Sequence, residues 1–386
     1  MKTFGNLYPQ ITSFDNLLLA ARNARKGKRF QVNVAQFDFQ LERNLFQLQQ
    51  ELQSKTYRPG VYHSFIISVP KERMISAAPY RDRVVHHALC NVTAPIFERT
   101  FIYDSYANRK GKGTHAAIQR YQHYARRYPY VLKCDIRKFF PSIDHALLKQ
   151  ELRWKITCPD TLWLIDTIID NSNPQEEHLV YFPGDDLFTP HQRRRGLPIG
   201  NLTSQWWGNI YLNRFDHYVK EELRVPGYIR FVDDFVLFGQ EKAQLKAWKE
   251  DVSTYLAGLR LLLHPDKTQI YPVEHGVPFL GFRVYPHYRQ VLKQNTRRYR
   301  RFLRKKLQRR KAGQLSPVSL ELALNSWLGH IRFGQARRLE YQIFWYLRRH
   351  GVNLFKHPGG SWRVLERQCN RMPFRLPQQE QSYQSE

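Results

Sequence analysis

The sequence predicts an α+β protein whose sheet is mostly antiparallel. Two apolar runs, at residues 229–232 and 235–238, flank the acidic pair Asp233-Asp234, which is the pattern of two strands joined by a tight turn. A third apolar run, at residues 131–136, carries a single acid near its end, Asp135. Helical segments alternate with these strands, but the glycine-rich fingerprint of a dinucleotide fold is absent, so an antiparallel sheet is favoured.

The composition is that of a folded and strongly basic protein. The chain has 386 residues, of which 42% are hydrophobic, and its 61 Lys and Arg against 33 Asp and Glu give a formal charge of +28. This hydrophobic fraction argues against intrinsic disorder, and the charge excess indicates a polyanionic partner. Because the cationic residues recur along the whole chain rather than on one amphipathic segment, nucleic acid is favoured over a membrane surface.

Two further observations favour a cytoplasmic protein without zinc or disulfides. No run of eighteen apolar residues occurs, and residues 1–16 lack the basic start and apolar run of a secretory signal. The four cysteines stand far apart, without C-x-x-C spacing. We therefore expect reduced thiols, a cytoplasmic location and no membrane partner.

The first third of the chain is expected to contain a helix, a β-hairpin and a second helix. Leucines spaced at i, i+4, i+7 and i+11 predict a helix over 41–53. Short β-like runs at 65–69 and 74–76 predict a hairpin. Thr114 is expected to cap a helix that extends to about Tyr128.

The middle of the chain is expected to continue with helices around the three predicted strands. Helical patterns begin at Leu147 and extend over 200–223 and 243–263. A short apolar β segment follows at 277–284.

The composition changes abruptly beyond Pro286. Residues 289–313 hold twelve Lys and Arg and no acid, which is unfavourable on a folded helix without a polyanion. The expected buried stripe of this helix consists of Tyr299, Phe302, Leu303 and Leu307. One or two helices are expected over 327–347, and residues from 359 onward are expected to form a loosely ordered tail.

The three acids suggest a chemistry if their strands are neighbours. Adjacent acids such as Asp233-Asp234 are ordinary turn residues, so the pair alone is a weak signal. In one sheet, however, Asp135 and Asp233 would converge and could bind two Mg²⁺ ions about 4 Å apart. Such a pair of ions serves an in-line displacement at phosphorus, so nucleotidyl transfer is the favoured reaction.

These residues resemble the motifs of reverse transcriptases. The segment Phe231–Asp234 stands where that family has Tyr-x-Asp-Asp, and Asp135 stands in its first carboxylate motif. The resemblance runs in the family's order from about Phe65 to His330. Further matching segments are Val69–Arg73, Arg81–Val85, Gly196–Gly200, His264–Lys267 and Phe279–Phe282.

One branch of the family is especially similar, the reverse transcriptases of diversity-generating retroelements. Ile199 stands where most relatives have Gln, and the segment Ile199–Gln205 is similar to this branch, although Phe231 departs from the usual Tyr. Other similar segments are Ser105–His115, Phe139–His145 and Ser326–His330. The resemblance implies an enzyme that copies a template RNA into cDNA with errors opposite adenines, diversifies a target gene, and works with a small, basic, oligomeric accessory protein.

The resemblance also implies catalytic roles. Asp135, Asp233 and the carbonyl of Ile136 are expected to bind two Mg²⁺ ions, with Mn²⁺ as an alternative, and Asp234 is expected to be a supporting or alternate ligand. Lys267 is expected to protonate the pyrophosphate leaving group. Without the resemblance, Lys267 would equally well be an exposed lysine in a turn.

Substrate contacts follow from the same resemblance. Lys71 and Arg73 are expected to neutralise the triphosphate of the incoming dNTP. Phe140 would lie under the sugar and exclude a 2′-hydroxyl. Ile199 and Gly200 would lie beside the nucleotide, where an aliphatic Ile199 could not hydrogen-bond to the sugar; packing alone is the other interpretation of Ile199.

Two basic segments are expected to bind template RNA and the cDNA product. Gly111-Lys112-Gly113-Thr114 lacks the P-loop spacing, but amides at a helix start could hold a phosphate, and a plain turn is the alternative. The second segment is the basic helix after residue 286. The expected contact residues are Arg109, Lys110, Lys112, Arg297, Arg301, Arg304 and Lys305.

The implied fold is a right-hand polymerase with fingers, a palm that carries the antiparallel sheet, and an α-helical thumb. Two alternatives remain: a retron or group II intron type of reverse transcriptase, and a non-catalytic RNA-binding maturase or scaffold. Nothing after the expected thumb resembles an HNH endonuclease module, which disfavours the intron type. The expected division is an N-terminal helical extension (1–60), fingers (61–130), palm with finger insertions (131–285), basic thumb (286–350) and tail (351–386).

Overall fold

The computed structural model describes residues 2–68, 72–172, 180–357 and 360–365. The chain divides into two compact units, each with its own hydrophobic core. The first unit consists of residues up to 280 with 284–287, and the second of residues 281–283 with those from 288 onward. The finer five-part division stays a prediction.

Within the described ranges, no helix combines the length and apolar character that crossing a bilayer requires. Cys90, Cys134 and Cys158 are buried free thiols, as expected, while Cys369 lies outside the described residues.

The first unit begins with four helices, α1 (Tyr8–Thr12), α2 (Phe14–Ala24), α3 (Val32–Phe39) and α4 (Leu41–Gln53). Helix α4 confirms the predicted bounds, and its leucines Leu45, Leu48 and Leu52 are fully buried. The long helix α5 (Tyr80–Glu98), against which α2 packs, was not predicted. It buries residues around much of its circumference and contains Pro95, so it lacks a clear one-sided pattern.

The predicted hairpin is confirmed. Strand β1 (His63–Ile67) pairs antiparallel with β2 (Arg73–Ala77), with Phe65 opposite Ile75. The predicted run at 74–76 lies within β2, while the run at 65–69 extends beyond β1, which ends at Ile67; residues 69–71 lie outside the described residues.

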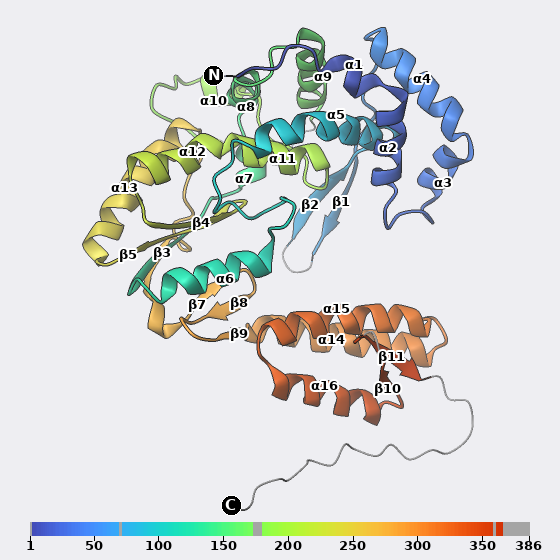
Figure 1. The fold of residues 1–386 in the computed structure, drawn as a ribbon, viewed down its shortest axis with the longest axis vertical. Coiled ribbons are helices and arrows are strands. Elements are labelled where there is room, and N and C mark those ends of the chain that lie inside the picture. The colour runs from blue at the N-terminus through green and yellow to red at the C-terminus, as the bar shows by residue number, and fades with distance from the viewer. Residues whose placement is uncertain (1, 69–71, 173–179, 358–359, 366–386) are drawn as a thin grey trace, which may run out of the picture. The chain divides into compact units, whose positions relative to one another are not determined.

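A four-stranded antiparallel sheet, called the central sheet below, lies on the left of the first unit in Figure 1. Its strands are β3 (Tyr130–Asp135), β4 (Gly227–Phe231), β5 (Asp234–Gly239) and β6 (Gln269–Pro272), in the order β4-β5-β3-β6. Three of them confirm the predicted apolar strands, and the prediction of an antiparallel sheet is confirmed.

Helices cover both faces of this sheet. Phe235 of β5 packs against Phe215 of α12 (Asn213–His217), with ring centroids 5.2 Å apart. Phe238, three residues further along, lies on the opposite face and packs against Tyr121 of α6 (Thr114–Ala125) at 4.9 Å. Since alternate strand residues point to opposite faces, each helix receives its own set of aromatic rings.

Several helix predictions need correction. Helix α6 begins at Thr114, but Thr114 does not cap it; Gly113, with φ +104°, is the cap residue. The segment 200–223 is interrupted rather than a single helix: α11 (Leu202–Tyr211) is followed by α12 and a short π-helix, Tyr218–Glu222.

Helix α13 (Lys242–Gly258) ends earlier than residue 263. Arg260 adopts a left-handed conformation (φ +58°), and the Leu261 N–H donates to the Leu256 carbonyl, so the chain turns out of the helix. Residues 262–263 then run beside Ile136 and Arg137.

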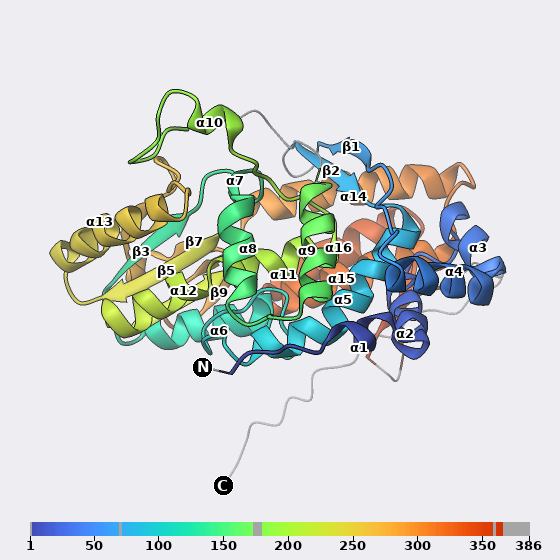
Figure 2. The ribbon, with the colours of Figure 1, turned by 90° about the horizontal axis from the view of Figure 1, so that it is seen from above.

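The remaining elements of the first unit are short. Helices α8 (His145–Arg153) and α9 (Pro159–Asp170) lie side by side (Figure 2). The others are α7 (Phe139–Ser142), α10 (Thr189–Gln192), a 3₁₀ turn (Val273–His275) and β7 (Val277–Phe279).

The second unit contains the basic helix α14 (Lys293–Lys311), α15 (Pro317–Phe333) and α16 (Arg337–Arg349). Tyr299, Leu303 and Leu307 of α14 face the core as predicted, but Phe302 does not, because it points away at 44% exposure. The tail prediction was also wrong in part, since β11 (Trp362–Leu365) pairs with β10 (Asn353–Lys356). Short strands β8 (Phe282–Val284) and β9 (Arg289–Val291) precede α14.

Gly227 is required by close packing at the start of β4. A methyl group there would lie 2.9 Å from Cβ of Phe238 and 3.2 Å from Cδ1 of Tyr124. Because a backbone-anchored Cβ cannot move aside, we expect Gly227→Ala to lower the free energy of unfolding by about 1–3 kcal/mol. Denaturant unfolding followed by circular dichroism measures the change.

Gly258→Ala is the matched control, since nothing lies within 4 Å of the position that its methyl group would take in α13. It should leave stability unchanged or raise it by up to ~1 kcal/mol. Equal destabilisation by both substitutions would contradict the packing at Gly227.

Candidate active site

The three predicted acids lie together at one end of the central sheet. Asp135 of β3 stands directly opposite Asp234 of β5, so their side chains share one face of the sheet. Asp233 lies in the turn between β4 and β5, and its carbonyl accepts a 3.1 Å hydrogen bond from the Ile136 N–H. The structure therefore brings together the residues that the sequence singled out as one carboxylate cluster.

The turn that carries Asp233 is strained. Val232 has φ +58°, a left-handed conformation that a β-branched residue rarely adopts. A residue held in this region costs on the order of 1–3 kcal/mol, so the surrounding hydrogen bonds must fix the turn. Such strain is common where a backbone presents a functional side chain.

Burial and mutual repulsion disfavour ionisation of the clustered acids. Burial raises the pKa of Asp233, and the Asp135 carboxylate adds to this effect while Arg73 and Lys267 oppose it. Burial, then the Asp233 carboxylate, raises the pKa of Asp234 to about 7, and a hydrogen bond with Asp135 contributes. A cation placed among these oxygens would relieve both effects.

Lys267 supplies one such positive charge. Its Nζ lies 2.5 Å from Oδ1 of Asp135, although the two residues are 132 positions apart. The backbone fixes this approach, because the His264 N–H donates to the Asp135 carbonyl at 2.7 Å and β6 pairs with β3. Lys267 thus lies in the carboxylate cluster. From the sequence alone, it could equally have been an exposed lysine in a turn.

The donor set suits a divalent metal ion. Carboxylate and carbonyl oxygens are the hard ligands that Mg²⁺ prefers, and Asp135, Asp233, Asp234 and the Ile136 carbonyl are all at this sheet end. In the described ranges, no three His, Cys, Asp or Glu side chains are already arranged around one point as ligands. The ion pair to Lys267 engages one of the oxygens that a metal would need.

The hairpin β1-β2 and the loop at 196–201 are joined beside this cluster. Arg73 opens β2, and its charge lowers the pKa of Asp233, which places it near the acids. The Ser76 N–H donates to the Ile199 carbonyl at 3.0 Å. Lys71 lies outside the described residues.

Gly200 allows the loop at 196–201 to approach β2 closely. It has φ +119°, and a Cβ there would stand 3.1 Å from Cγ2 of Ile75. The same loop reaches Phe140, because the Leu197 N–H donates to the Phe140 carbonyl at 2.9 Å. The predicted nucleotide residues Arg73, Phe140, Ile199 and Gly200 thus occupy connected segments, and their roles stay predictions.

Asn201, which joins this loop to β2, was not among the predicted site residues. Its side-chain Nδ2 donates to the Ser76 carbonyl at 3.0 Å, and its Oδ1 accepts from the Ala78 N–H at 3.2 Å. Asparagine after glycine is an ordinary turn residue, and its partners lie more than 120 positions away, so no local pattern could reveal it.

The predicted nucleic-acid residues fall into two groups. The guanidinium of Arg109 is used internally: it donates to Glu98 at 2.7 Å and to the Ile102 and Ser105 carbonyls. Lys112 covers the ring of Tyr103 at 3.3 Å, and Lys110 is exposed. The four predicted residues on α14 all have exposed side chains: Arg297, Arg301, Arg304 and Lys305. Their contacts with nucleic acid stay predictions.

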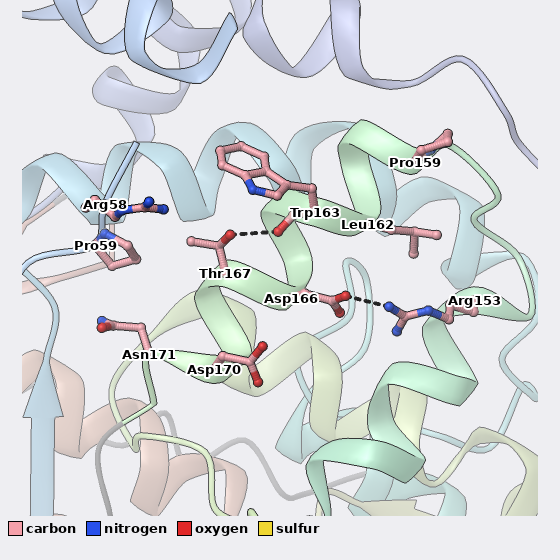
Figure 3. A pocket seen from close by; sticks show the side chains of 10 residues that line it. All are labelled: Arg58, Pro59, Arg153, Pro159, Leu162, Trp163, Asp166, Thr167, Asp170 and Asn171. Atoms are coloured by element: carbon pink, nitrogen blue, oxygen red, sulfur yellow. Dashed lines mark hydrogen bonds and ion pairs between the residues drawn. The ribbon is translucent and has the colours of Figure 1, made fainter. Parts of the chain in front are cut away.

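A cavity of about 700 Å³ lies elsewhere in the first unit, against α9 and the end of α8 (Figure 3). Two acids that line it are paired within the protein: Asp166 accepts from Arg153 at 2.5 Å, and Asp170 accepts from Lys149 at 2.8 Å. None of the predicted site residues lines it.

The raised pKa of Asp234 predicts a pH-dependent stability. The folded protein binds this proton more tightly than an unfolded chain with the ordinary value of 3.8, so stability falls as pH rises from about 4 to about 7. Without divalent metal, Asp234→Asn should therefore raise the melting temperature at pH 8 by at least ~2 °C, and leave it nearly unchanged at pH 4. Calorimetry in chelator-containing buffers measures both values.

Asp251→Asn, on the exposed side of α13, is the control, and its melting temperature should differ from that of the wild type by the same small amount at both pH values. If the difference in melting temperature between Asp234→Asn and wild type did not change with pH, burial and repulsion would not raise the pKa of Asp234 as inferred.

Comparison with known proteins agrees with this arrangement. Residues 67–284, more than half of the chain, match the family model described as reverse transcriptase (RNA-dependent DNA polymerase). Protein YkfC of Escherichia coli is 28% identical over 293 residues, which cover 66% of this chain and 74% of that protein. A putative COX1/OXI3 intron 1 protein of Saccharomyces cerevisiae is 22% identical over 277 residues, which cover 57% of this chain but only 32% of that protein. The chain therefore belongs to the reverse transcriptase family and is an RNA-directed DNA polymerase, a nucleotidyltransferase.

Proposed function

We propose that Asp135, Asp233 and Asp234 form the catalytic centre of this polymerase and that, with the Ile136 carbonyl, they hold two Mg²⁺ ions. The observation that carries the proposal is the opposition of Asp135 and Asp234 across β3 and β5, with Asp233 bonded through its carbonyl to Ile136. When bound, the ions would stabilise the negative charge on the phosphates and so favour attack of a primer 3′-hydroxyl on the dNTP α-phosphate.

Neighbouring residues receive roles in substrate binding. Arg73, and Lys71 on the adjoining connection, would neutralise the triphosphate. Phe140 would exclude a 2′-hydroxyl and so select deoxynucleotides. Lys267, already within 2.5 Å of Asp135, would donate a proton to the departing pyrophosphate.

Substitution of Asp233 tests the catalytic assignment. Primer extension on an RNA template with Mg²⁺ should fall by at least ~10³-fold in Asp233→Asn, because one anionic ligand is lost while size is preserved. Asp251→Asn is the control and should extend primers at the wild-type rate. Wild-type activity in Asp233→Asn would contradict the assignment of Asp233 to the catalytic centre, whereas a wild-type protein that binds RNA but extends no primer would favour a non-catalytic RNA-binding scaffold.

We further propose that the enzyme belongs to a diversity-generating retroelement and acts in the cytoplasm with a basic, oligomeric accessory protein. The support is the similarity of several segments to that branch and the aliphatic Ile199 in the loop joined to β2. An aliphatic side chain cannot hydrogen-bond to the nucleotide sugar, so one check on pairing geometry would be missing.

Ile199→Gln tests this explanation of fidelity. Restoring a hydrogen-bonding side chain should lower misincorporation opposite template adenines by about tenfold, the effect of roughly 1.4 kcal/mol of discrimination. Sequencing of cDNA made from a defined RNA template gives the error rate at each base. Val61→Gln introduces the same amide at an exposed position outside the loop at 196–201, so it is the control and should leave the error rate unchanged.

An unchanged adenine error rate in Ile199→Gln would remove Ile199 from the explanation. An error rate without adenine bias in the wild-type enzyme would instead favour the second candidate, an intron-type reverse transcriptase or maturase. The observation that favours this candidate is the match to the yeast intron 1 protein.

A further inference from the structure

A fully buried ion pair contacts the turn Val232-Asp233, which joins β4 to β5. Arg230 of β4 and Asp216 of α12 both have 0% exposed side chains. Nε and one terminal nitrogen of Arg230 each donate to a different Asp216 oxygen, both at 2.7 Å, so the pair is bidentate. The Tyr228 hydroxyl also donates to Asp216 at 2.7 Å.

The second terminal nitrogen of Arg230 points to the turn itself. It donates to the Val232 carbonyl at 3.1 Å and to Oδ1 of Asn209 on α11 at 3.2 Å. Asn209 in turn donates to the Ala107 carbonyl at 2.9 Å. One side chain therefore connects the turn with two helices and the segment around residue 107.

Both central carbonyls of the turn are held by specific donors. The Val232 carbonyl is bound by Arg230, and the Asp233 carbonyl by the Ile136 N–H. The two donors come from different segments, one from β4 and one from the residue after Asp135. Since Val232 is in a strained conformation, loss of either donor would allow the turn to relax and move the Asp233 carboxylate.

A contribution to the folding stability of the protein does not by itself explain why this ion pair is present. Two charges removed from water regain their desolvation energy only with near-ideal geometry, and apolar pairs of similar volume are often equally stable. What an apolar side chain cannot provide is the donor to the Val232 carbonyl. The forked shape of the guanidinium permits one residue to bind Asp216 and still reach the turn.

We propose that Arg230, oriented by Asp216, is a positioning residue that fixes the strained Val232-Asp233 turn and so sets the location of the Asp233 carboxylate. This inference rests on the proposed catalytic role of Asp233. Displacement of a reacting group by about 1 Å can cost 10²-fold in rate, so Arg230 would influence the chemical step without touching substrate.

A paired substitution tests the proposal without leaving an uncompensated buried charge. Arg230→Met combined with Asp216→Leu removes both charges and the donor to Val232. We expect kcat for primer extension to fall by about 10- to 100-fold, with KM for dNTP within twofold of wild type. Amide hydrogen exchange in the metal-free protein should accelerate at residues 229–239 but not elsewhere in the sheet.

Arg230→Met with Asp216→Asn is the second variant, in which the asparagine oxygen can still accept from Tyr228; it keeps the test decisive if the first variant does not fold. Tyr228→Phe is the matched control, because it removes a hydrogen bond to the same carboxylate but keeps the donor to Val232. It should lower the melting temperature while leaving kcat and the exchange of the turn at wild-type values.

The outcomes separate this inference from the proposed function. A folded Arg230 variant with wild-type kcat would overturn the positioning role, provided that Asp233→Asn is inactive in the same assay. If Asp233→Asn were active, the catalytic assignment itself would fail, and the inference with it. Equal effects of Tyr228→Phe and the Arg230 variants on kcat would also overturn it, since general destabilisation would then explain both.

Discussion

The pairing of β3 with β5 is the constraint on which the site depends. Antiparallel register places Asp135 opposite Asp234, and a shift of one residue would move one of the two acids to the other face of the sheet. The apolar side chains along both strands fix that register, because Phe235 and Phe238 are buried against helices on opposite faces. The hydrophobic core thus holds together acids that repel one another, and burial, followed by this repulsion, raises the pKa of Asp234.

Patterns within one element were predictable from the sequence, whereas contacts between distant elements were not. The leucine spacing of α4 gave its bounds, and the apolar runs around Asp233-Asp234 gave β4 and β5. Helix α5 was missed because it is buried over much of its surface. The end of α13 was missed because a left-handed arginine, rather than a glycine, terminates it.

The candidate site shows the same division. The three acids could be proposed because each ends or joins an apolar strand. By contrast, Arg230 in an apolar strand could equally have faced solvent at a sheet edge, and only the position of Asp216 on a separate helix explains its burial. Likewise, the pairing of Lys267 with Asp135 depends on how β6 joins the sheet.

The bonds between β2 and the loop at 196–201 have a consequence for motion. Ser76 bonds through its backbone N–H to Ile199 and through its carbonyl to Asn201, which in turn accepts from Ala78. Strand and loop are therefore joined by three hydrogen bonds, so a tilt of the hairpin that keeps these bonds would move Ile199 and Gly200 together with Arg73. With the nucleotide contacts proposed for Arg73, Ile199 and Gly200, a substitution that displaces the hairpin would also alter the loop surface, so the two contacts could not be adjusted independently.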